Sequence, residues 1–253
     1  MKNRMKKILL SAFIVVIAAI GCKKDDTLRY NNLTMGNIVG ETIVSDQGNT
    51  FDIAETHFEV DLQKFEYGRV LLMCDVLKKT SENRYDIRLT GIESVLTKNV
   101  LPLSEITEDE LMVEDAINIR DIWYGGGYLN LFVEFAQKED SKTKHRITLV
   151  HDDQSQEEGY AFTLRHNAYG EIPSEEDREY RSAFGYVSFP IAGLIKEDSA
   201  DITMKWKSHK RLPGGNYSLL ETEDITQVCK WERIGYEHSI PQLKASSRAF
   251  RAM

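Results

Sequence analysis

The chain has 253 residues, with 40 acidic and 32 basic side chains, and a formal net charge of −8. Such an acidic chain repels nucleic-acid phosphates unless it hides a basic patch, so nucleic acid is not an expected partner. The length fits one large or two small domains and is sufficient for real hydrophobic cores.

The first 26 residues predict a secretory signal peptide that ends in a lipidated cysteine. Residues 1–7 are short and basic, and residues 8–20 form a run of low polarity, shorter than the roughly 20 residues of a membrane-spanning helix. Gly21 supplies a small residue at the cut. We therefore predict a signal peptide over residues 1–21 and lipidation of Cys22. An ordinary cleaved signal with a chance cysteine is the alternative.

Residues 22–33 are predicted to be a polar, lipidated tether. Cleavage before Cys22 leaves 232 residues, and because it removes four basic and no acidic side chains the mature net charge becomes −12. Each acyl CH₂ buried in a membrane contributes about 0.8 kcal/mol, so the membrane is an expected partner through the lipid on Cys22. Residues 23–26 resemble signals that send lipoproteins to the surface of some Gram-negative bacteria. We expect a protein anchored in the outer membrane at the cell surface, with a periplasm-facing anchor as the alternative.

Residues 34–108 predict a small OB-like β-barrel. Residues 69–77 form an apolar strand, and residues 85–90 alternate strictly, as a half-buried strand does. Residues 36–44 are also rich in β-forming side chains, and a turn signal follows at 46–49. Five short strands over about 80 residues suit an OB-like barrel.

The second half predicts an antiparallel β-sandwich over residues 117–240, after an acidic linker at 109–116. Residues 128–135 place alternate apolar side chains on one face, and Gly125, Gly126 and Gly127 before them accept φ > 0, so a hairpin is expected. Residues 241–253 are predicted to be a flexible tail. Further strands are expected at 146–151, 160–166, 184–191 and 202–206.

Two cysteines besides Cys22 lie far apart in the sequence. Cys74 sits in the apolar strand, and Cys229 lies near the C-terminus. Export would permit a disulfide, but spacing alone does not establish one. Two isolated, buried thiols are the preferred interpretation.

The ordered segments 92–103, 121–131, 164–169 and 185–189, together with the lipoprotein start, resemble the NigD-like lipoproteins. The resemblance implies an N-terminal OB-like domain joined to a C-terminal β-sandwich, in agreement with the predicted strands. It brings no catalytic residues. The family name comes from a bacteriocin-associated gene cluster, which suggests roles in bacteriocin production or immunity.

Four side chains are weak candidates for a ligand site. Arg165 and Asn167 share one face of a predicted strand and would form a small polar site, although Arg165 pairing a carboxylate and Asn167 capping a turn is the plainer interpretation. Trp123 and Tyr128 flank the glycine turn and could stack on a sugar, although aromatic residues there more often belong to the core.

No motif in the sequence supports catalysis, a metal or a cofactor. There is no HExxH run, CxxC pair, EF-hand loop or G-x-S-x-G elbow. The tripeptides that begin at Asp26 and Asp198 resemble sites of exported O-glycosylation, which makes Thr27 and Ser199 candidates for modification.

These observations favour a non-enzymatic outer-membrane lipoprotein that binds an envelope protein or a glycan. The first alternative is a bacteriocin-associated immunity or envelope protection factor. The second is a hydrolase whose site is dispersed along the chain.

Overall fold

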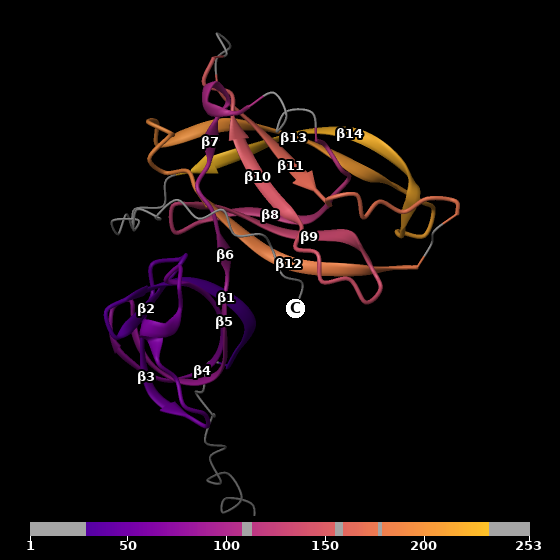
Figure 1. The fold of residues 1–253 in the computed structure, drawn as a ribbon. Coiled ribbons are helices and arrows are strands. Elements are labelled where there is room, and N and C mark those ends of the chain that lie inside the picture. The colour runs from indigo at the N-terminus through magenta and orange to yellow at the C-terminus, as the bar shows by residue number, and fades with distance from the viewer. Residues whose placement is uncertain (1–28, 108–112, 155–158, 177–178, 233–253) are drawn as a thin grey trace, which may run out of the picture.

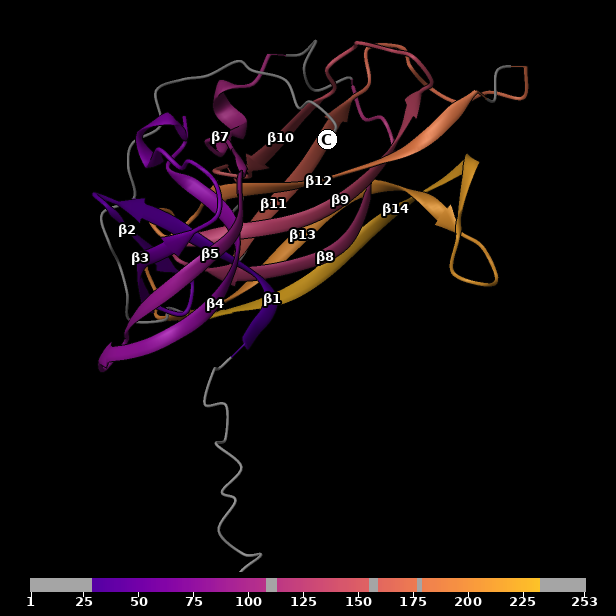
Figure 2. The ribbon, with the colours of Figure 1, turned by 90° about the horizontal axis from the view of Figure 1, so that it is seen from below.

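The computed structural model describes residues 29–107, 113–154, 159–176 and 179–232, and these residues form two β domains. A closed barrel lies below a sandwich of two sheets in Figure 1, and Figure 2 shows the two domains from below. The all-β prediction is confirmed. The predicted signal peptide, Cys22, Thr27 and the predicted tail at 241–253 lie outside the described residues.

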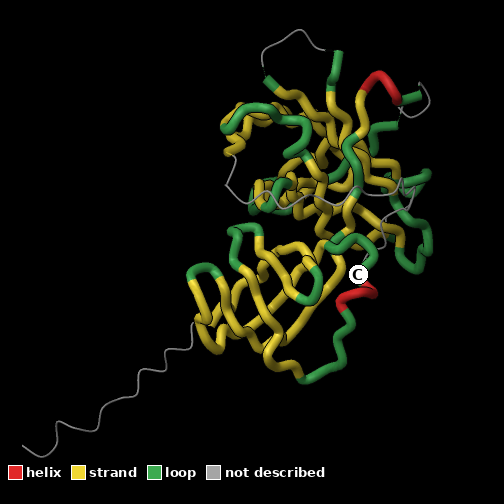
Figure 3. The backbone as a smooth tube through the Cα atoms, turned by 90° about the vertical axis from the view of Figure 1, so that its left-hand side faces the viewer, coloured by secondary structure: helices red, strands yellow, loops and turns green. Residues whose placement is uncertain are grey.

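The N-terminal domain is a five-stranded barrel with the strand order β1-β2-β3-β5-β4, closed by pairing of β1 with β4. Its centre is filled by side chains such as Ile43, Phe51 and Ile87, each 1 % exposed or less. Their neighbours alternate outward, as the period of a strand requires. The short 3-10 turn η1 (Leu62–Lys64) lies between β3 and β4 and is one of the red segments in Figure 3. The barrel strands are β1 (Arg29–Val39), β2 (Thr42–Ser45), β3 (Thr50–Thr56), β4 (Arg69–Ser81) and β5 (Arg84–Ser94).

The barrel occupies a different range from the predicted 34–108. It begins with β1 at Arg29, inside the predicted tether, and ends with β5 at Ser94. The next strands, β6 (Leu96–Thr97) and β7 (Leu101–Pro102), pair with strands of the sandwich. The 3-10 turn η2 (Leu103–Glu105) follows them. Strands of two residues show no alternation, so their place in the sandwich could not be predicted from the sequence pattern.

The C-terminal domain packs a five-stranded sheet, β14-β13-β11-β10-β7, against a four-stranded sheet, β6-β12-β9-β8. The predicted hairpin is confirmed: β8 and β9 are joined by Gly126 and Gly127, whose φ angles are 59° and 86°. The remaining strands are β8 (Asn118–Gly125), β9 (Tyr128–Lys138), β10 (Arg146–His151), β11 (Tyr160–Asn167), β12 (Tyr180–Pro190), β13 (Ser199–Arg211) and β14 (Tyr217–Glu232).

Two features of the sandwich differ from the expectation. The pairs β6–β12, β7–β10 and β11–β13 are parallel, so the sheets are mixed rather than purely antiparallel. The 16-residue strand β14 was not predicted, because it is exposed along most of its length and carries no regular apolar alternation. The apolar face expected for residues 128–135 does point into the core, through Leu129, Leu131, Val133 and Phe135.

Candidate functional site: the groove between the two domains

A buried arginine of the barrel joins the two domains. Arg69 begins β4 and its side chain is fully buried. Its Nη1 and Nη2 each donate to one carboxylate oxygen of Asp46, both at 2.8 Å. Its guanidinium carbon also lies 4.1 Å from the ring centre of Tyr128, which belongs to the sandwich. A charge this deeply buried is tolerated only when it is paired and fully hydrogen-bonded.

Every N–H of that guanidinium has an acceptor. Besides the two bonds to Asp46, Nη1 donates to Asn37 Oδ1 at 3.1 Å, which lies within the barrel. Across the domain boundary, Nε donates to Ser188 Oγ at 2.9 Å and Nη2 donates to Asn130 Oδ1 at 2.7 Å. An arginine has five such donors, and all five are matched here. We call this cluster of Asn37, Asp46, Arg69, Asn130 and Ser188 the interdomain seam.

The glycine turn of the β8–β9 hairpin owes its composition to this seam. A Cβ at Gly125 would lie 2.6 Å from Asp46 Cβ, and a Cβ at Gly126 would lie 2.6 Å from Asp46 Oδ1. Gly126 also has a positive φ of 59°. Glycine is therefore required both by the backbone conformation and by the close approach of the barrel.

The predicted aromatic candidates are part of the contact between the domains. Tyr128 is 2 % exposed, and its ring packs on Arg69; burial raises the pKa of its phenol. Trp123 is half-buried and packs with Tyr186 beside a small cluster of buried apolar side chains. The Trp123 and Tyr186 rings meet edge-on, with centroids 6.3 Å apart. The structure therefore places both candidates in packing between the domains and does not bring them to the Arg165 strand.

Next to the seam the domains diverge and leave a groove of about 580 Å³. Its sandwich wall carries a stack of rings: Phe132 lies 4.7 Å from Tyr186 and 5.9 Å from Phe184, both at 23° between ring planes. The groove is lined by Phe58, Leu71, Met73, Gly91, Ile92 and Glu93 of the barrel and by Phe132 and residues 181–186 of the sandwich.

Several apolar side chains in this groove are open to solvent. Phe58, Met73 and Phe184 are 38 %, 47 % and 42 % exposed. Exposed apolar side chains that gather in one concave surface mark a binding site more often than scattered ones do. Methionine adds a flexible wall, because its side chain adapts to the shape of what it touches. Sequence periodicity could not reveal this site, because it forms only when β4, β5 and β12 meet.

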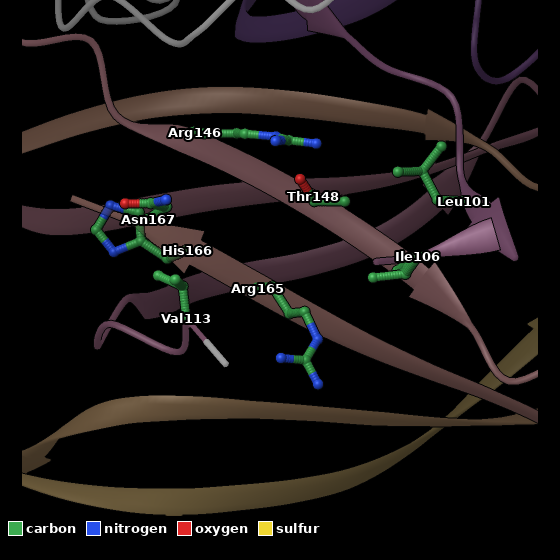
Figure 4. Close-up of a pocket in the computed structure, with 8 residues that line it drawn as sticks. All are labelled: Leu101, Ile106, Val113, Arg146, Thr148, Arg165, His166 and Asn167. Atoms are coloured by element: carbon green, nitrogen blue, oxygen red, sulfur yellow. The ribbon is translucent and has the colours of Figure 1, made fainter. Parts of the chain in front are cut away.

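Arg165 and Asn167 line a second, smaller pocket of about 230 Å³ on the sandwich (Figure 4). Arg165 Nη1 pairs with Glu114 Oε1 at 2.9 Å, and Asn167 Oδ1 accepts the Tyr169 N–H at 2.8 Å. These contacts agree with the plainer interpretation, in which Arg165 pairs with a carboxylate and Asn167 caps a turn. The pocket is lined by Leu101, Ile106, Val113, Arg146, Thr148, Arg165, His166 and Asn167.

Two buried histidines, of which His166 lines that pocket, are linked to a loop carboxylate. His145 Nδ1 and His166 Nε2 are 3.0 Å apart, and His145 Nε2 lies 3.3 Å from Glu171 Oε2. Burial, with a contribution from His145, lowers the pKa of His166 to about 3. Within the described ranges no group of three or more His, Cys, Asp or Glu side chains is arranged to hold a metal ion.

The other described residues singled out in the sequence lie outside both the groove and the smaller pocket. Ser199, a candidate for O-glycosylation, is exposed at the start of β13. Cys74 is a buried free thiol, as predicted, whereas Cys229 is free but half-buried rather than buried, because β14 is exposed along most of its length. Burial and Asp75 raise the pKa of Cys74 to about 11. No helix in the described part of the chain is long and apolar enough to cross a membrane.

The fold and the seam define a class: a two-domain β protein in which a buried barrel arginine, paired with a barrel carboxylate, is hydrogen-bonded to the sandwich. Residues 99–214 match the NigD-like C-terminal beta sandwich domain. The sandwich therefore matches a domain of the NigD-like family, in support of the sequence resemblance. The comparison with curated proteins finds no match.

Solved structures with the same fold cover most of both domains. A protein of unknown function from Bacteroides vulgatus is 17% identical with a TM-score of 0.58, over 81% of this chain and 92% of that one. A NigD-like immunity protein from Bacteroides caccae is 17% identical with a TM-score of 0.55, over 79% and 95%. A candidate lipoprotein from Bacteroides fragilis is 15% identical with a TM-score of 0.51, over 79% and 96%. At these identities the likeness is one of fold.

Proposed function

We propose that this protein is a lipid-anchored envelope protein that binds a macromolecular partner in the groove between its domains and catalyses no reaction. The observation that carries the proposal is the groove itself, about 580 Å³ in volume and lined by both domains. Pockets that bind ligands are typically apolar hollows with a few polar groups, and they are common at domain interfaces.

The chemistry of the groove suits binding. Its ionisable lining residues are Glu93, Arg181 and Tyr186, and Arg181 donates to Gln137 Oε1 at 3.0 Å. Burial, Asp121 and Glu93 raise the pKa of the Tyr186 phenol, so it stays protonated at neutral pH. Ser182 also lines the groove and donates to Glu134 Oε1 at 2.7 Å, but that carboxylate is held in an ion pair with Arg120, so no free general base stands next to the hydroxyl. The seam favours a preformed groove, because the Arg69 guanidinium is held by Asp46 within the barrel and donates to Ser188 and Asn130 of the sandwich, which fixes the domains against each other.

The anchor in this proposal is the lipid on Cys22, supported by the order of basic, apolar and small residues before it. The variant Cys22→Ala is expected to leave the membrane fraction, either as a soluble periplasmic protein or as a precursor. Fractionation of cells followed by immunoblotting measures this. Continued presence of Cys22→Ala in the outer-membrane fraction would overturn the anchor.

The groove is tested by comparative capture from detergent-solubilised envelopes. Wild-type protein is expected to enrich an envelope component that the double variant Met73→Ser/Phe184→Ser does not retain, as measured by quantitative mass spectrometry. Leu212→Ser is the control, because Leu212 is 41 % exposed, nearly the same as Phe184, and lies outside the groove. Equal enrichment by wild type and the groove variant would contradict the proposal.

A second candidate function is immunity against a bacteriocin. It is favoured by one observation, the shared fold with a NigD-like immunity protein from Bacteroides caccae. In that case the partner in the groove is a toxin or the toxin's target. Cells that lack the gene are then expected to become more sensitive in a bacteriocin challenge, and unchanged sensitivity would contradict this candidate.

A further inference from the structure

One edge of β12 is open where it borders the groove. On the side away from β9, the described residues pair with β12 only at Val187 and Ser188, through the two-residue strand β6. β6 directly follows the barrel strand β5 in the chain, and Figure 1 shows it between the two domains. Residues 181–186 of β12 therefore have no strand beside them on this side among the described residues.

The six consecutive residues 181–186 all line the groove. Successive side chains of a strand point to opposite faces of the sheet, so an unbroken run contacts one hollow only when that hollow lies along the edge of the strand. The opposite wall repeats the pattern, because Gly91, Ile92 and Glu93 of β5 are also consecutive. β3 pairs with β5 only as far as Leu89, so among the described residues that part of β5 has no second neighbouring strand.

The direction of the backbone groups follows from one hydrogen bond. The Ser188 carbonyl accepts the Lys98 N–H at 3.1 Å, on the β6 side. The N–H and C=O of one residue point to the same side of a strand, and the side changes with each residue. The β12–β9 register runs from Tyr180 to Pro190 without a shift, so Ser182, Phe184 and Tyr186 present their N–H and C=O to the open edge.

We propose that the groove binds an extended peptide segment of the partner as an added strand on β12. This proposal rests on the function proposed above and specifies how the partner binds. Added strands take their affinity from main-chain hydrogen bonds and their specificity from pockets for alternate side chains. Residues 181–186 span about 20 Å of extended chain, enough for six residues of a peptide.

The groove also defines the composition of that peptide. Phe58, Met73 and Phe184 are the exposed apolar side chains of the groove, so alternate positions of the peptide are apolar. Arg181 lies at one end of the open edge, and Glu93 lies near Tyr186 at the other, close enough to affect the pKa of its phenol. Complementary charge places a carboxylate of the peptide near Arg181 and a basic side chain near Glu93.

The test uses two capped eight-residue probes, Glu-Thr-Val-Thr-Phe-Thr-Val-Lys and its reversed sequence, so that both strand directions are covered. Purified mature protein is titrated with each probe and followed by amide NMR and hydrogen exchange. The amides of Ser182, Phe184 and Tyr186 are expected to gain protection on binding. Those of Ala183 and Gly185, which point to β9, are expected to change little in protection.

Two matched changes isolate the main-chain bonds. The amide N–H groups of the bound probe alternate between the side that faces β12 and the opposite side. Methylating the nitrogens of the set that faces β12 is expected to weaken binding about tenfold, and methylating the other set is expected to change it little. In the protein, Ser182→Pro removes an N–H that points to the open edge, a position where a strand tolerates proline. It is expected to weaken binding about tenfold relative to Ser182→Ala, because both variants lose the same hydroxyl bond to Glu134.

The outcomes separate this inference from the proposed function. If a probe binds and Phe184→Ser weakens it, while both N-methylated forms and Ser182→Pro bind like their controls, strand addition is overturned and the groove remains a binding site. If neither probe binds at millimolar concentration, strand addition is also overturned. The proposed function itself is tested separately, by the envelope capture with the Met73→Ser/Phe184→Ser variant. Probe methylation keeps the test decisive even if Ser182→Pro does not fold.

Discussion

The variant Arg69→Ala is expected to destabilise the protein strongly, because it removes one partner of a buried ion pair. Arg69 is fully buried and Asp46 is 5 % exposed, so the remaining carboxylate has no access to water as a substitute partner. Breaking such a pair typically costs about 3–5 kcal/mol. Asn130 and Ser188 on the sandwich side lose a donor as well, so the upper part of this range is expected.

The matched control is Arg84→Ala in the same barrel. Arg84 also binds a carboxylate through two nitrogens, with Nε 2.6 Å and Nη2 2.7 Å from the two oxygens of Asp52. Its side chain is 51 % exposed, so water replaces the lost partner. Removing it is expected to cost far less stability than removing Arg69.

Urea unfolding followed by tryptophan fluorescence measures both variants, with Trp123 reporting on the contact between the domains. Asp46→Asn on the Arg69→Ala background removes the stranded charge and is expected to recover part of the lost stability. If Arg69→Ala costs no more than Arg84→Ala, the interdomain seam does not hold the two domains together as described.

Three further predictions concern single residues. Gly126→Ala is expected to lower stability in urea more than Gly40→Ala does. Both glycines have φ near +60°, but only Gly126 has barrel atoms within 4 Å of an added Cβ. Equal losses of stability would contradict the close contact between Gly126 and the barrel. Since the pKa of His166 falls from an ordinary 6.5 to about 3 in the fold, the folded protein binds fewer protons than the unfolded chain between these values, and stability is lost as pH falls through this window. The dependence of the urea midpoint on pH is expected to be shallower in His166→Asn, and an unchanged slope would argue against a neutral buried imidazole. Cys74, with a pKa of about 11, is expected to resist iodoacetamide at pH 8 until the protein unfolds, whereas the half-buried Cys229 reacts first; mass spectrometry of the labelled peptides decides between them.

Local patterns predicted the hairpin well. The alternation of residues 128–135 and the glycines before it gave the strand, its buried face and the turn, because all three depend on neighbouring residues. The same reasoning missed β14, which is a strand because it pairs with β13 along its length, whatever the polarity of its side chains. Backbone pairing with the preceding strand leaves no periodic signal in a polar segment.

The site depended on contacts that no local pattern records. Arg69 and Asp46 are separated by 23 residues, and Arg69 and Ser188 by 119, so their meeting follows from the packing of the two domains. The aromatic candidates Trp123 and Tyr128 were identified from their place beside the glycine turn, and they do lie at the domain contact. The open edge of β12 could not be foreseen, because it results from β6 being only two residues long.

Photo-crosslinking in living cells tests most directly whether the groove is the binding site. A photoreactive phenylalanine analogue is placed at Phe184 in the groove and, separately, at Leu212, which has nearly the same exposure outside it. The account predicts a crosslinked adduct with an envelope component from position 184 and none from position 212. An adduct at 212 alone, the same adduct at both positions, or none at 184 would contradict it.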